Sequence, residues 1–215
     1  MTRLVLIRHG ESQTAVDGLV GGLRTCNGLS DLGRRQASLL RDRLAATREL
    51  DPVDVLFAST MPRARETAEL IAPAIGGIPV VEDEDFCERH PGEADGLTYT
   101  AAIEKYGVPE FSDDPHLALS PGGETWMAFH TRVGGAMRRV VHDNEGRTVV
   151  IACHAGVVDV ALRALLDLPV VGGFELYTQN TSLTELVFVP ESDRRPAPRW
   201  RLLRYNDAAH LAGLS

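Results

Sequence analysis

The chain has 215 residues and a formal net charge of -8, from 22 Lys and Arg against 30 Asp and Glu, and 44% of its residues are hydrophobic. This composition fits one or two globular domains and excludes a disordered chain, a collagen and a coiled coil. Because the balance is acidic and no basic stripe with interleaved aromatic residues occurs, we expect no binding to nucleic acid or to an anionic membrane.

The apolar runs and the cysteines suggest where the protein works. The longest uninterrupted runs, 4–7 and 149–153, are far shorter than the roughly 20 residues that a bilayer-spanning helix needs. Charged residues follow the first run directly, so no stretch is long enough for a signal peptide. Cys26, Cys87 and Cys153 are an odd number without a close pair, which favours reduced thiols. We expect a cytoplasmic protein with a small-molecule partner, and the sequence is compatible with a homo-oligomer.

The first part of the chain shows strands alternating with helices. Residues 4–7 are a run of branched apolar residues, typical of a strand buried on both faces. Ser30 is a common N-cap residue before a helical pattern, residues 53–57 predict a second strand, and Pro62 suits the first turn of a second helix. A third strand is expected at 78–81. The apolar helical positions are Leu32, Ala37, Leu40 and Leu44 in the first helix, and Ala64, Ala68 and Ile71 in the second.

Residues 82–122 interrupt this alternation. The segment is rich in acidic residues, Gly and Pro, and its only predicted helix is a short one at 98–106. We interpret it as an insertion that lies over the carboxyl-end edge of the sheet.

The alternation then resumes to the end of the chain. A long helix is expected from Trp126 to Val140, followed by a buried strand at 148–153 and a helix around 157–165. Two strands, 183–189 and 200–205, are joined by a turn region at 190–198. Strands and helices joined by short links indicate an α/β fold, a three-layer α/β/α sandwich with a mostly parallel central sheet. We expect a single domain over residues 1–215.

Two of the seven histidines directly follow buried strands. His9 follows the strand at 4–7, and His154 follows the strand at 148–153. Ligands of open α/β sheets bind outside the carboxyl ends of the strands. If the two strands are neighbours, both imidazoles meet at one edge, beside free backbone N–H groups that favour an anion. Either histidine alone could have no role beyond ending its strand, but two histidines that both directly follow buried strands are poorly explained in this way.

Two arginines lie at the same end of the predicted sheet. Arg8 precedes His9, and Arg63 is in the first turn of its helix, where a cation opposes the helix dipole. Because a planar guanidinium matches phosphate oxygens, these side chains and His154 predict a phosphoryl-binding pocket. The competing hypothesis is a metal site built from both histidines and a carboxylate. Two guanidinium groups would repel a divalent ion, and the sequence has no HExxH motif.

A series of short motifs runs in order along nearly the whole chain. Its members are RHGES at 8–12, LSDLGRRQA at 29–37, the segment from Ser59 to Thr67, GGE at 122–124, CHAG at 153–156, NTS at 180–182 and YND at 205–207. This series resembles the histidine phosphatase superfamily, in its phosphoglycerate-mutase-like branch. An isolated RHG motif would be weak evidence, whereas the ordered series is specific.

The resemblance implies a mechanism that uses neither a cofactor nor a metal. His9 would attack phosphorus and become phosphohistidine, while Arg8, Arg63 and His154 would hold the phosphoryl oxygens. This assignment agrees with the pocket expected from the residues, and covalent catalysis splits one difficult displacement into two easier ones.

A proton donor for the leaving oxygen completes the implied site. Glu88 matches the acid of the family by its spacing to Gly92 and Gly96. The alternative is that Glu88 is one more acid of an acidic insertion and that Glu84 or Asp85 takes the role. We therefore expect a phosphomonoesterase that acts on small phosphorylated metabolites.

A cofactor-dependent phosphoglycerate mutase is the alternative function, because those mutases also have the sequence at 88–90, ERH. In the mutases a Tyr follows and a Lys lies further on, where this chain has Pro91 and Tyr99. The mutases also use an Arg pair in the insertion, whereas residues 93–122 contain six acids and a single base, Lys105. A multiply charged bisphosphate would lack counter-charges there, so a phosphatase is favoured.

Other positions bear on the pocket and on turnover. The family's Asn shortly after RHGES is Ala15 here, which bears on the phosphate contacts, and the Trp of its usual GxWEG pattern is Ala94, which suggests a leaving-group pocket of different shape. A third hypothesis is a phosphate-binding protein that has lost turnover. Its sign would be replacement of His9, Glu88 or His154, and all three are present.

Overall fold

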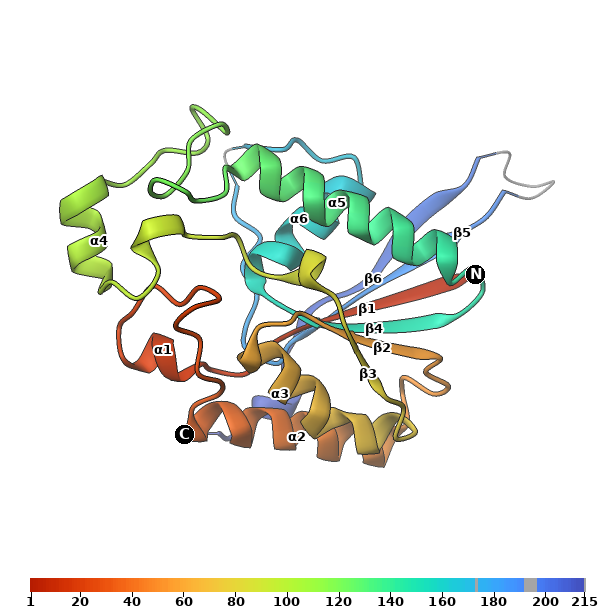
Figure 1. Cartoon of the computed structure of the whole chain (residues 1–215). Coiled ribbons are helices and arrows are strands. Elements are labelled where there is room, and N and C mark those ends of the chain that lie inside the picture. The colour runs from red at the N-terminus through yellow and green to blue at the C-terminus, as the bar shows by residue number, and fades with distance from the viewer. Residues whose placement is uncertain (173, 192–196, 215) are drawn as a thin grey trace.

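A six-stranded sheet in the order β3-β2-β4-β1-β5-β6 runs through the middle of the molecule (Figure 1). The structure is a computed structural model that describes residues 1–172, 174–191 and 197–214. Neighbouring strands from β3 to β1 are parallel, whereas β5 and β6 are added antiparallel. The expected α/β class with a mostly parallel sheet is confirmed. The strands are β1 (Thr2–Arg8), β2 (Val55–Ala58), β3 (Val80–Glu82), β4 (Thr148–Cys153), β5 (Leu183–Val189) and β6 (Arg199–Asp207).

Helices cover both faces of this sheet. Helices α2 and α3 lie on one face and α5 and α6 on the other, so the expected three layers are present (Figure 1). The N-cap of α2 is Ser30, whose hydroxyl accepts from the backbone N–H of Gly33 at 3.0 Å, and Pro62 opens α3. The helices are α1 (Gln13–Val16), α2 (Asp31–Thr47), α3 (Pro62–Ile71), α4 (Tyr99–Tyr106), α5 (Trp126–Asp143) and α6 (Ala155–Leu165).

The central strands have apolar side chains on both faces because each face packs under a helical layer. In β1, Leu4 and Leu6 pack on the side of α5 and α6, whereas Val5 and Ile7 pack on the side of α2 and α3. All four side chains are fully buried. This alternation explains why the strand has an unbroken apolar sequence. Strand β1 pairs with β4, and this pairing brings the candidate functional residues together.

The structure differs from the expected elements at a few places. Strand β3 begins at Val80 rather than at Ile78, because Pro79 has no N–H to donate to a ladder. Helix α1 was not expected, since four residues are too few to show a period. Short 3-10 turns occur at 72–75, 84–86, 92–94 and 209–211. The turn region expected at 190–198 lies partly outside the described residues.

The inserted segment after β3 lies beside the carboxyl ends of the parallel strands (Figure 1). Asp95 attaches it to the loop after α1, because its carboxylate accepts from the backbone N–H groups of Gly22 and Arg24 at 3.0 Å each and from the hydroxyl of Thr25 at 2.5 Å. On its other side, Arg132 of α5 donates to the carbonyl of Asp85 at 2.9 Å. The insertion is therefore held from two sides over this edge.

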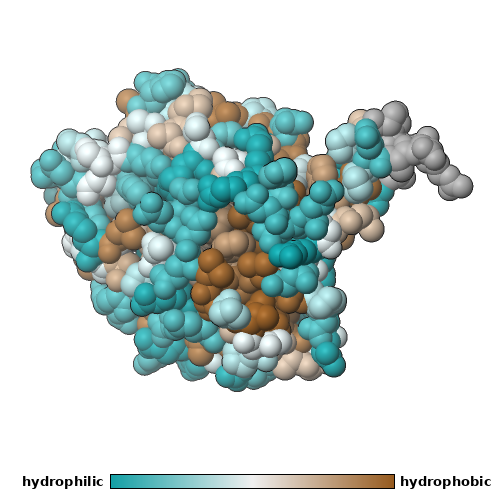
Figure 2. Space-filling view, turned by 45° about the vertical axis from the view of Figure 1, so that its right-hand side comes forward, coloured by the Kyte–Doolittle hydropathy of each residue, from teal (hydrophilic) through white to brown (hydrophobic). Residues whose placement is uncertain are grey.

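The outer surface of the molecule is largely hydrophilic on the face shown in Figure 2, with an apolar patch below the middle of the view. The end of the molecule formed by β5 and β6 projects to one side. Within the described ranges, no helix combines the length and the apolar character that crossing a bilayer would require.

Candidate active site

The two predicted histidines meet at the carboxyl ends of β1 and β4. The strands pair in parallel with Arg8 opposite Cys153, and the backbone N–H of His9 donates to the Cys153 carbonyl at 2.9 Å. The His9 and His154 ring centroids are 5.0 Å apart with an interplanar angle of 63°. Their side chains lie inside the molecule, since His9 is 8% exposed and His154 is 0% exposed. The expectation that the strands are neighbours and bring the imidazoles together is confirmed.

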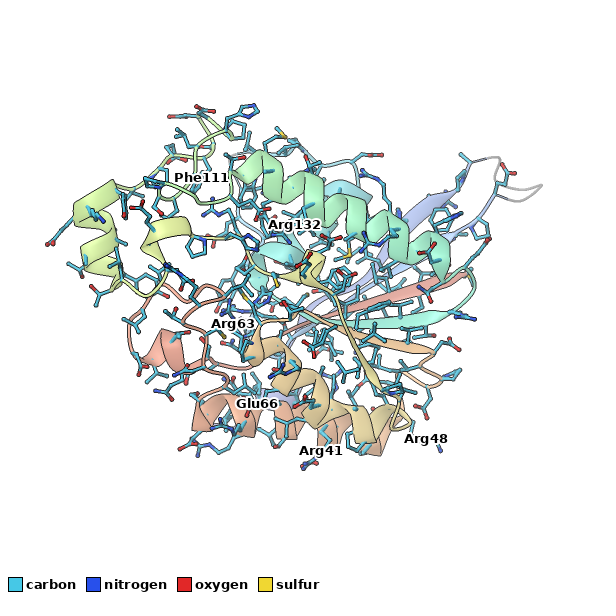
Figure 3. The ribbon with its side chains drawn as sticks, viewed as in Figure 1. Arg41, Arg48, Arg63, Glu66, Phe111 and Arg132 are labelled. Carbon is cyan, nitrogen blue, oxygen red and sulfur yellow. The ribbon has the colours of Figure 1, made fainter. Side chains whose placement is uncertain are left out.

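Arg63 lies between the two imidazoles. It projects from the first turn of α3 toward the strand ends (Figure 3), and it is only 5% exposed. Its Nε–H group is 3.0 Å from Nε2 of His9 and 3.3 Å from Nδ1 of His154. The other arm of the guanidinium donates to the carbonyl of Gly21 at 3.2 Å. Arg63 is therefore a fixed cation of the pocket rather than a solvated residue of a helix end.

Arg8 brings a second cation to the same edge. One of its terminal nitrogens donates to the carbonyl of Thr178, while its Nε is buried without a hydrogen-bond partner in the described structure. Burial lowers the pKa of Arg8, but the nearby Glu88 opposes this shift. Among the described residues, neither Arg8 nor Arg63 forms an ion pair with a carboxylate. Such unpaired guanidinium groups at strand ends suit an anion.

The hydrogen bonds of His9 define its tautomer. The Nδ1 atom lies 2.6 Å from the carbonyl oxygen of Gly10, which can only accept, so we assign the proton to Nδ1. The Nε2 lone pair then faces the N–H group of Arg63. Burial and the charge of Arg63 lower the pKa of His9 well below its usual value, so the ring is neutral at neutral pH. A neutral imidazole can act as a nucleophile through the lone pair of Nε2 once a ligand oxygen takes the N–H of Arg63.

His154 is held by a second set of hydrogen bonds. Its Nε2 lies 2.8 Å from Oγ of Ser59, whose hydroxyl is 3.3 Å from Sγ of Cys87. Because the N–H of Arg63 points at Nδ1, we assign the proton of the free ring to Nε2. Burial and then the charge of Arg63 lower the pKa of His154 well below its usual value. Both imidazoles of the pocket are therefore uncharged at neutral pH.

Glu88 reaches the pocket from the insertion. Its Oε1 accepts from the backbone N–H of Arg89 and its Oε2 from the N–H of Gly156, each at 3.0 Å. Gly156 belongs to the first turn of α6, and a Cβ at this position would lie 2.3 Å from Oε1 of Glu88. Of the candidate acids, Asp85 instead pairs with Arg139 at 2.9 Å. Glu84 is exposed. The structure therefore brings Glu88 to the pocket, and Asp85 is engaged elsewhere.

Some residues that support the pocket were not singled out from the sequence for a role in it. Ser59 contacts His154, and Asn180 donates from Nδ2 to the carbonyl of His9 at 2.9 Å. Thr178 accepts from Arg8 through its backbone. Asn180 and Thr178 lie just before β5. Because β5 runs antiparallel to β1, it starts at the sheet edge where β1 ends, and this position is the signal by which the sequence could have located both residues.

The structure places two positions at which this chain departs from the family pattern, Ala94 and Tyr99. Ala94 is fully buried, and its backbone N–H donates to Oγ of Ser120 at 3.0 Å. The same hydroxyl donates to the carbonyl of Pro91 at 2.6 Å. Tyr99 is 52% exposed at the start of α4. Ser120 thus closes this turn of the insertion around the buried Ala94.

The family assignment follows from comparison with known proteins. The sequence pattern of the histidine phosphatase superfamily (branch 1) matches residues 4–207. The chain belongs to the histidine phosphatase superfamily. The predicted resemblance is thereby confirmed, and the match extends from β1 to the end of β6.

Individual relatives of this histidine phosphatase include phosphatases and a mutase. It is 32% identical to a metal-independent phosphoserine phosphatase of Arabidopsis thaliana over 163 residues, which is 74% of this chain and 66% of the relative. It is 30% identical to a 2,3-bisphosphoglycerate-dependent phosphoglycerate mutase of Caulobacter vibrioides, covering 86% and 90% of the two chains. A mycobacterial glucosyl-3-phosphoglycerate phosphatase structure superposes with a TM-score of 0.76 at 28% identity, covering 95% and 98%. The family and its phosphatase members show that the protein is a phosphatase enzyme.

Proposed function

We propose that this histidine phosphatase hydrolyses monoesters of small phosphorylated metabolites without a metal, through a phosphohistidine formed on His9. The observation that carries the proposal is the neutral Nε2 atom of His9, which lies 3.0 Å from Nε of Arg63 in a pocket whose two cations have no carboxylate partner among the described residues. A nucleophile next to unpaired guanidinium groups fits a phosphoryl group.

The chemistry proceeds in two displacements. In the first, the Nε2 lone pair of His9 attacks phosphorus, the bond from phosphorus to the ester oxygen breaks, and Glu88 gives a proton to the departing alkoxide. In the second, Glu88 takes a proton from water as the water oxygen attacks phosphorus and the bond to Nε2 breaks. Inorganic phosphate and the alcohol are the products, and both His9 and Glu88 return to their starting states.

The cations and His154 stabilise the phosphoryl oxygens during both displacements. The carbonyls of Gly21 and Thr178 hold one arm each of Arg63 and Arg8, which leaves other N–H groups of both for the ligand. The hydroxyl of Ser59 can accept from or donate to Nε2 of His154, so this ring can present an N–H at Nδ1 when an oxygen replaces the N–H of Arg63. Donors held in place beforehand stabilise developing charge without reorganisation.

The mutase alternative is disfavoured by the charge of the insertion. Its only base between 93 and 122, Lys105, lies 3.9 Å from the carboxylate of Glu93 on the surface. Arg89, directly after Glu88, stacks over the ring of Phe111 at 4.0 Å. Apart from Arg89, which forms no ion pair among the described residues, the insertion therefore offers no unpaired Lys or Arg for the second phosphate or the carboxylate of a bisphosphoglycerate.

The direct test is hydrolysis of a chromogenic aryl phosphate by the purified protein with and without a chelator, paired with an assay for interconversion of 2- and 3-phosphoglycerate. The proposal expects release of phosphate that is unchanged by the chelator, and no significant interconversion. Loss of turnover in chelator would contradict the metal-independent mechanism. Interconversion faster than hydrolysis would support the mutase, and no turnover of any ester would support a phosphate-binding protein.

A further inference from the structure

Asp95 of the insertion is a buried carboxylate with hydrogen bonds to both of its oxygens. Its side chain is only 5% exposed. Oδ1 accepts from the backbone N–H of Gly22 at 3.0 Å and from the hydroxyl of Thr25 at 2.5 Å. Oδ2 accepts from the backbone N–H of Arg24 at 3.0 Å, and the side chain of Arg24 adds a longer contact at 3.5 Å. The carboxylate is therefore directed at the loop of residues 22–25.

Asp95 is charged at neutral pH. Burial alone would raise the pKa of this carboxyl, but the hydrogen bonds from Thr25 and from the backbone N–H groups of Arg24 and Gly22 outweigh burial and lower it. The one ion pair that it forms among the described residues is weak, because the nitrogen of Arg24 lies 3.5 Å away and that side chain is 68% exposed. The negative charge is thus stabilised mainly by neutral donors of the loop.

One of these donors belongs to a peptide that also contacts Arg63. The peptide between Gly21 and Gly22 has its N–H bonded to Asp95, and its carbonyl oxygen accepts from Nη1 of Arg63 at 3.2 Å. Because the peptide is planar and trans, its N–H and C=O groups point in opposite directions. Asp95 and Arg63 therefore contact the two sides of one rigid peptide unit.

A carboxylate on one side of a peptide strengthens the hydrogen bond on the other side. Hydrogen bonds in a chain polarise one another by roughly 10–30% per bond, and the effect is favoured where water is excluded. The charge of Asp95 therefore makes the carbonyl oxygen of Gly21 a better acceptor for Nη1 of Arg63. The peptide also has little room to turn, because a Cβ at Gly22 would lie only 2.5 Å from Oδ2 of Asp95.

The contact with Gly21 sets the direction of the Arg63 guanidinium. With Nη1 held by this carbonyl, Nε points at the imidazoles of His9 and His154, at 3.0 and 3.3 Å. Nη2 makes no hydrogen bond to any residue in the described part of the chain. Nε and Nη2 form one edge of the planar group and present two parallel N–H donors, which fit two phosphoryl oxygens. Arg63 would lose this direction if Gly21 released it.

We propose that Asp95 is a positioning residue for phosphate binding: through the peptide between Gly21 and Gly22 it holds Nη1 of Arg63 and directs the Nε and Nη2 edge at the phosphoryl group. The inference rests on the proposed phosphatase function. It gives the insertion a second role, since the segment that supplies the proton donor Glu88 also orients a cation of the pocket.

The alternative is a purely structural role, in which Asp95 only fastens the insertion that carries Glu88. The two roles affect substrates differently. In the proposed function Arg63 contacts the phosphoryl group, which all substrates share, whereas Glu88 protonates the leaving oxygen, which matters much more for alkyl than for aryl phosphates. A loss through Arg63 is therefore equal for both ester types, and a loss through Glu88 is larger for the alkyl ester.

The test is a double-mutant cycle between Asp95→Asn and Arg63→Ala, measured with an alkyl and an aryl phosphate. Asp95→Asn removes the charge with almost no change of shape, and it should lower kcat/KM by about five- to twentyfold for both esters, as for one charge-assisted hydrogen bond. Beside Arg63→Ala, the same substitution should change kcat/KM by less than about twofold. A loss of equal size in both backgrounds, or a clearly larger loss for the alkyl ester, would overturn the inference.

Thr25→Val is the matched control. It removes the other hydrogen bond to Oδ1 of Asp95 and keeps both the charge and the contact with Gly22. It should lower kcat/KM by less than about threefold, and a loss as large as that of Asp95→Asn would contradict the role of the peptide. If Asp95→Asn does not fold, Asp95→Glu, which keeps the charge but moves the carboxylate, takes its place in the same cycle with the same expected dependence on Arg63.

Binding of inorganic phosphate separates this inference from the proposed function, because it needs no turnover. By calorimetry, Asp95→Asn should raise the phosphate Kd about fivefold, and by less than about twofold beside Arg63→Ala. A wild-type protein that binds phosphate but hydrolyses neither ester would contradict the phosphatase function alone. Hydrolysis and phosphate binding that are both unchanged by Asp95→Asn would reject the role of Asp95 and leave the phosphatase function standing.

Discussion

Two groups of arginines in this protein have opposite surroundings. In one group, Arg43, Arg204 and Arg3 share the carboxylates of Glu49, Asp207 and Glu185 at distances of 2.5 to 3.3 Å. In the other, Arg8 and Arg63 lie beside the histidines, and their hydrogen-bond acceptors are backbone carbonyls and, for Arg63, the two imidazoles. The first group holds strands and a helix together, and in the proposed function the second keeps its positive charge available for the phosphoryl group.

The comparison shows that the partners of an arginine reveal its role better than its burial does. The paired group links α2, β1, β5 and β6, segments far apart in the sequence, and its half-buried ion pairs are neutralised within the protein. In the pocket, Arg63 is 5% exposed and still has no carboxylate partner among the described residues. Burying a cation without a counter-charge costs stability, so such a site is expected to serve function.

The largest effect is expected from His9→Ala. Removing the nucleophile should lower kcat/KM by roughly 10⁴-fold or more, as for other covalent catalysts. The thermal unfolding midpoint should change little, because the side chain contributes little to the apolar core. The control His142→Ala changes a histidine at the end of α5, far from the strand ends, and should leave kcat/KM near the wild-type value. Hydrolysis by His9→Ala at wild-type rate would end the assignment of His9.

Glu88→Gln should affect substrates according to their leaving groups. Alkyl phosphates need a proton on the departing oxygen, so their turnover should fall by roughly 10²- to 10⁴-fold. An aryl phosphate leaves without much protonation and should lose far less in single-turnover phosphorylation. Equal losses for both substrate types would remove Glu88 from the acid role, and Glu84→Gln and Asp85→Asn then become the variants to measure.

Arg63→Ala should lower kcat/KM by roughly 10²- to 10³-fold, because this cation contacts charge that develops in the transition state. Arg63→Lys should recover only part of the loss, since an ammonium lacks the planar fork. Arg65→Ala removes an arginine of the same helix whose ion pair with Glu69 spans 3.7 Å on the surface, and it should change kcat/KM less than twofold. Similar losses in the two alanine variants would contradict the contrast between free and paired arginines.

A smaller effect, on stability, is expected when the paired group is broken. Hydrogen bonding to Arg43 lowers the pKa of Asp207 in the folded protein below its usual value of 3.8. A carboxyl with a lowered folded pKa stabilises the fold above the unfolded value, and that contribution is lost as the pH falls below about 4. Asp207→Asn should therefore lower the free energy of unfolding by about 1–2 kcal/mol at pH 7 and by less near pH 3.

Chemical denaturation at both pH values measures this change, with Asp42→Asn as the control. Asp42 pairs with Arg41 at 2.7 Å, but its side chain is 63% exposed. Asp42→Asn should therefore change the free energy of unfolding very little. Turnover by Asp207→Asn should stay near wild type. A loss of stability in Asp207→Asn that grows as the pH falls would contradict stabilisation by the charged carboxylate of Asp207.

The sequence predicts much of this site because its main groups come directly after buried strands. His9 and His154 follow continuous apolar runs, and the parallel pairing of those runs brings the rings together. Arg63 was predicted from its unfavourable place at a helix N-terminus. Local patterns thus locate a group whenever its strand or helix has a clear period and a defined end.

The remaining features depend on contacts between distant segments. The contact between Ser59 and His154 spans 95 positions, and the free hydroxyl of Thr178 becomes visible only in the packed structure. The insertion has no period that predicts its path, since Asp95 holds it through backbone N–H groups of the loop at 22–24. The sharing of carboxylates by Arg43 and Arg204 is equally long-range. No local pattern distinguishes a paired arginine from a free one.

The central claim is that the phosphoryl group passes through His9. It is tested most directly by mixing the enzyme with a ³²P-labelled ester, quenching within milliseconds in alkaline detergent, which preserves phosphohistidine, and mapping the labelled peptide. We expect label on His9 alone, rapid loss of that label when unlabelled substrate is added, and no label in His9→Ala. Label on a serine or a cysteine, or an unlabelled protein throughout steady turnover, would contradict it.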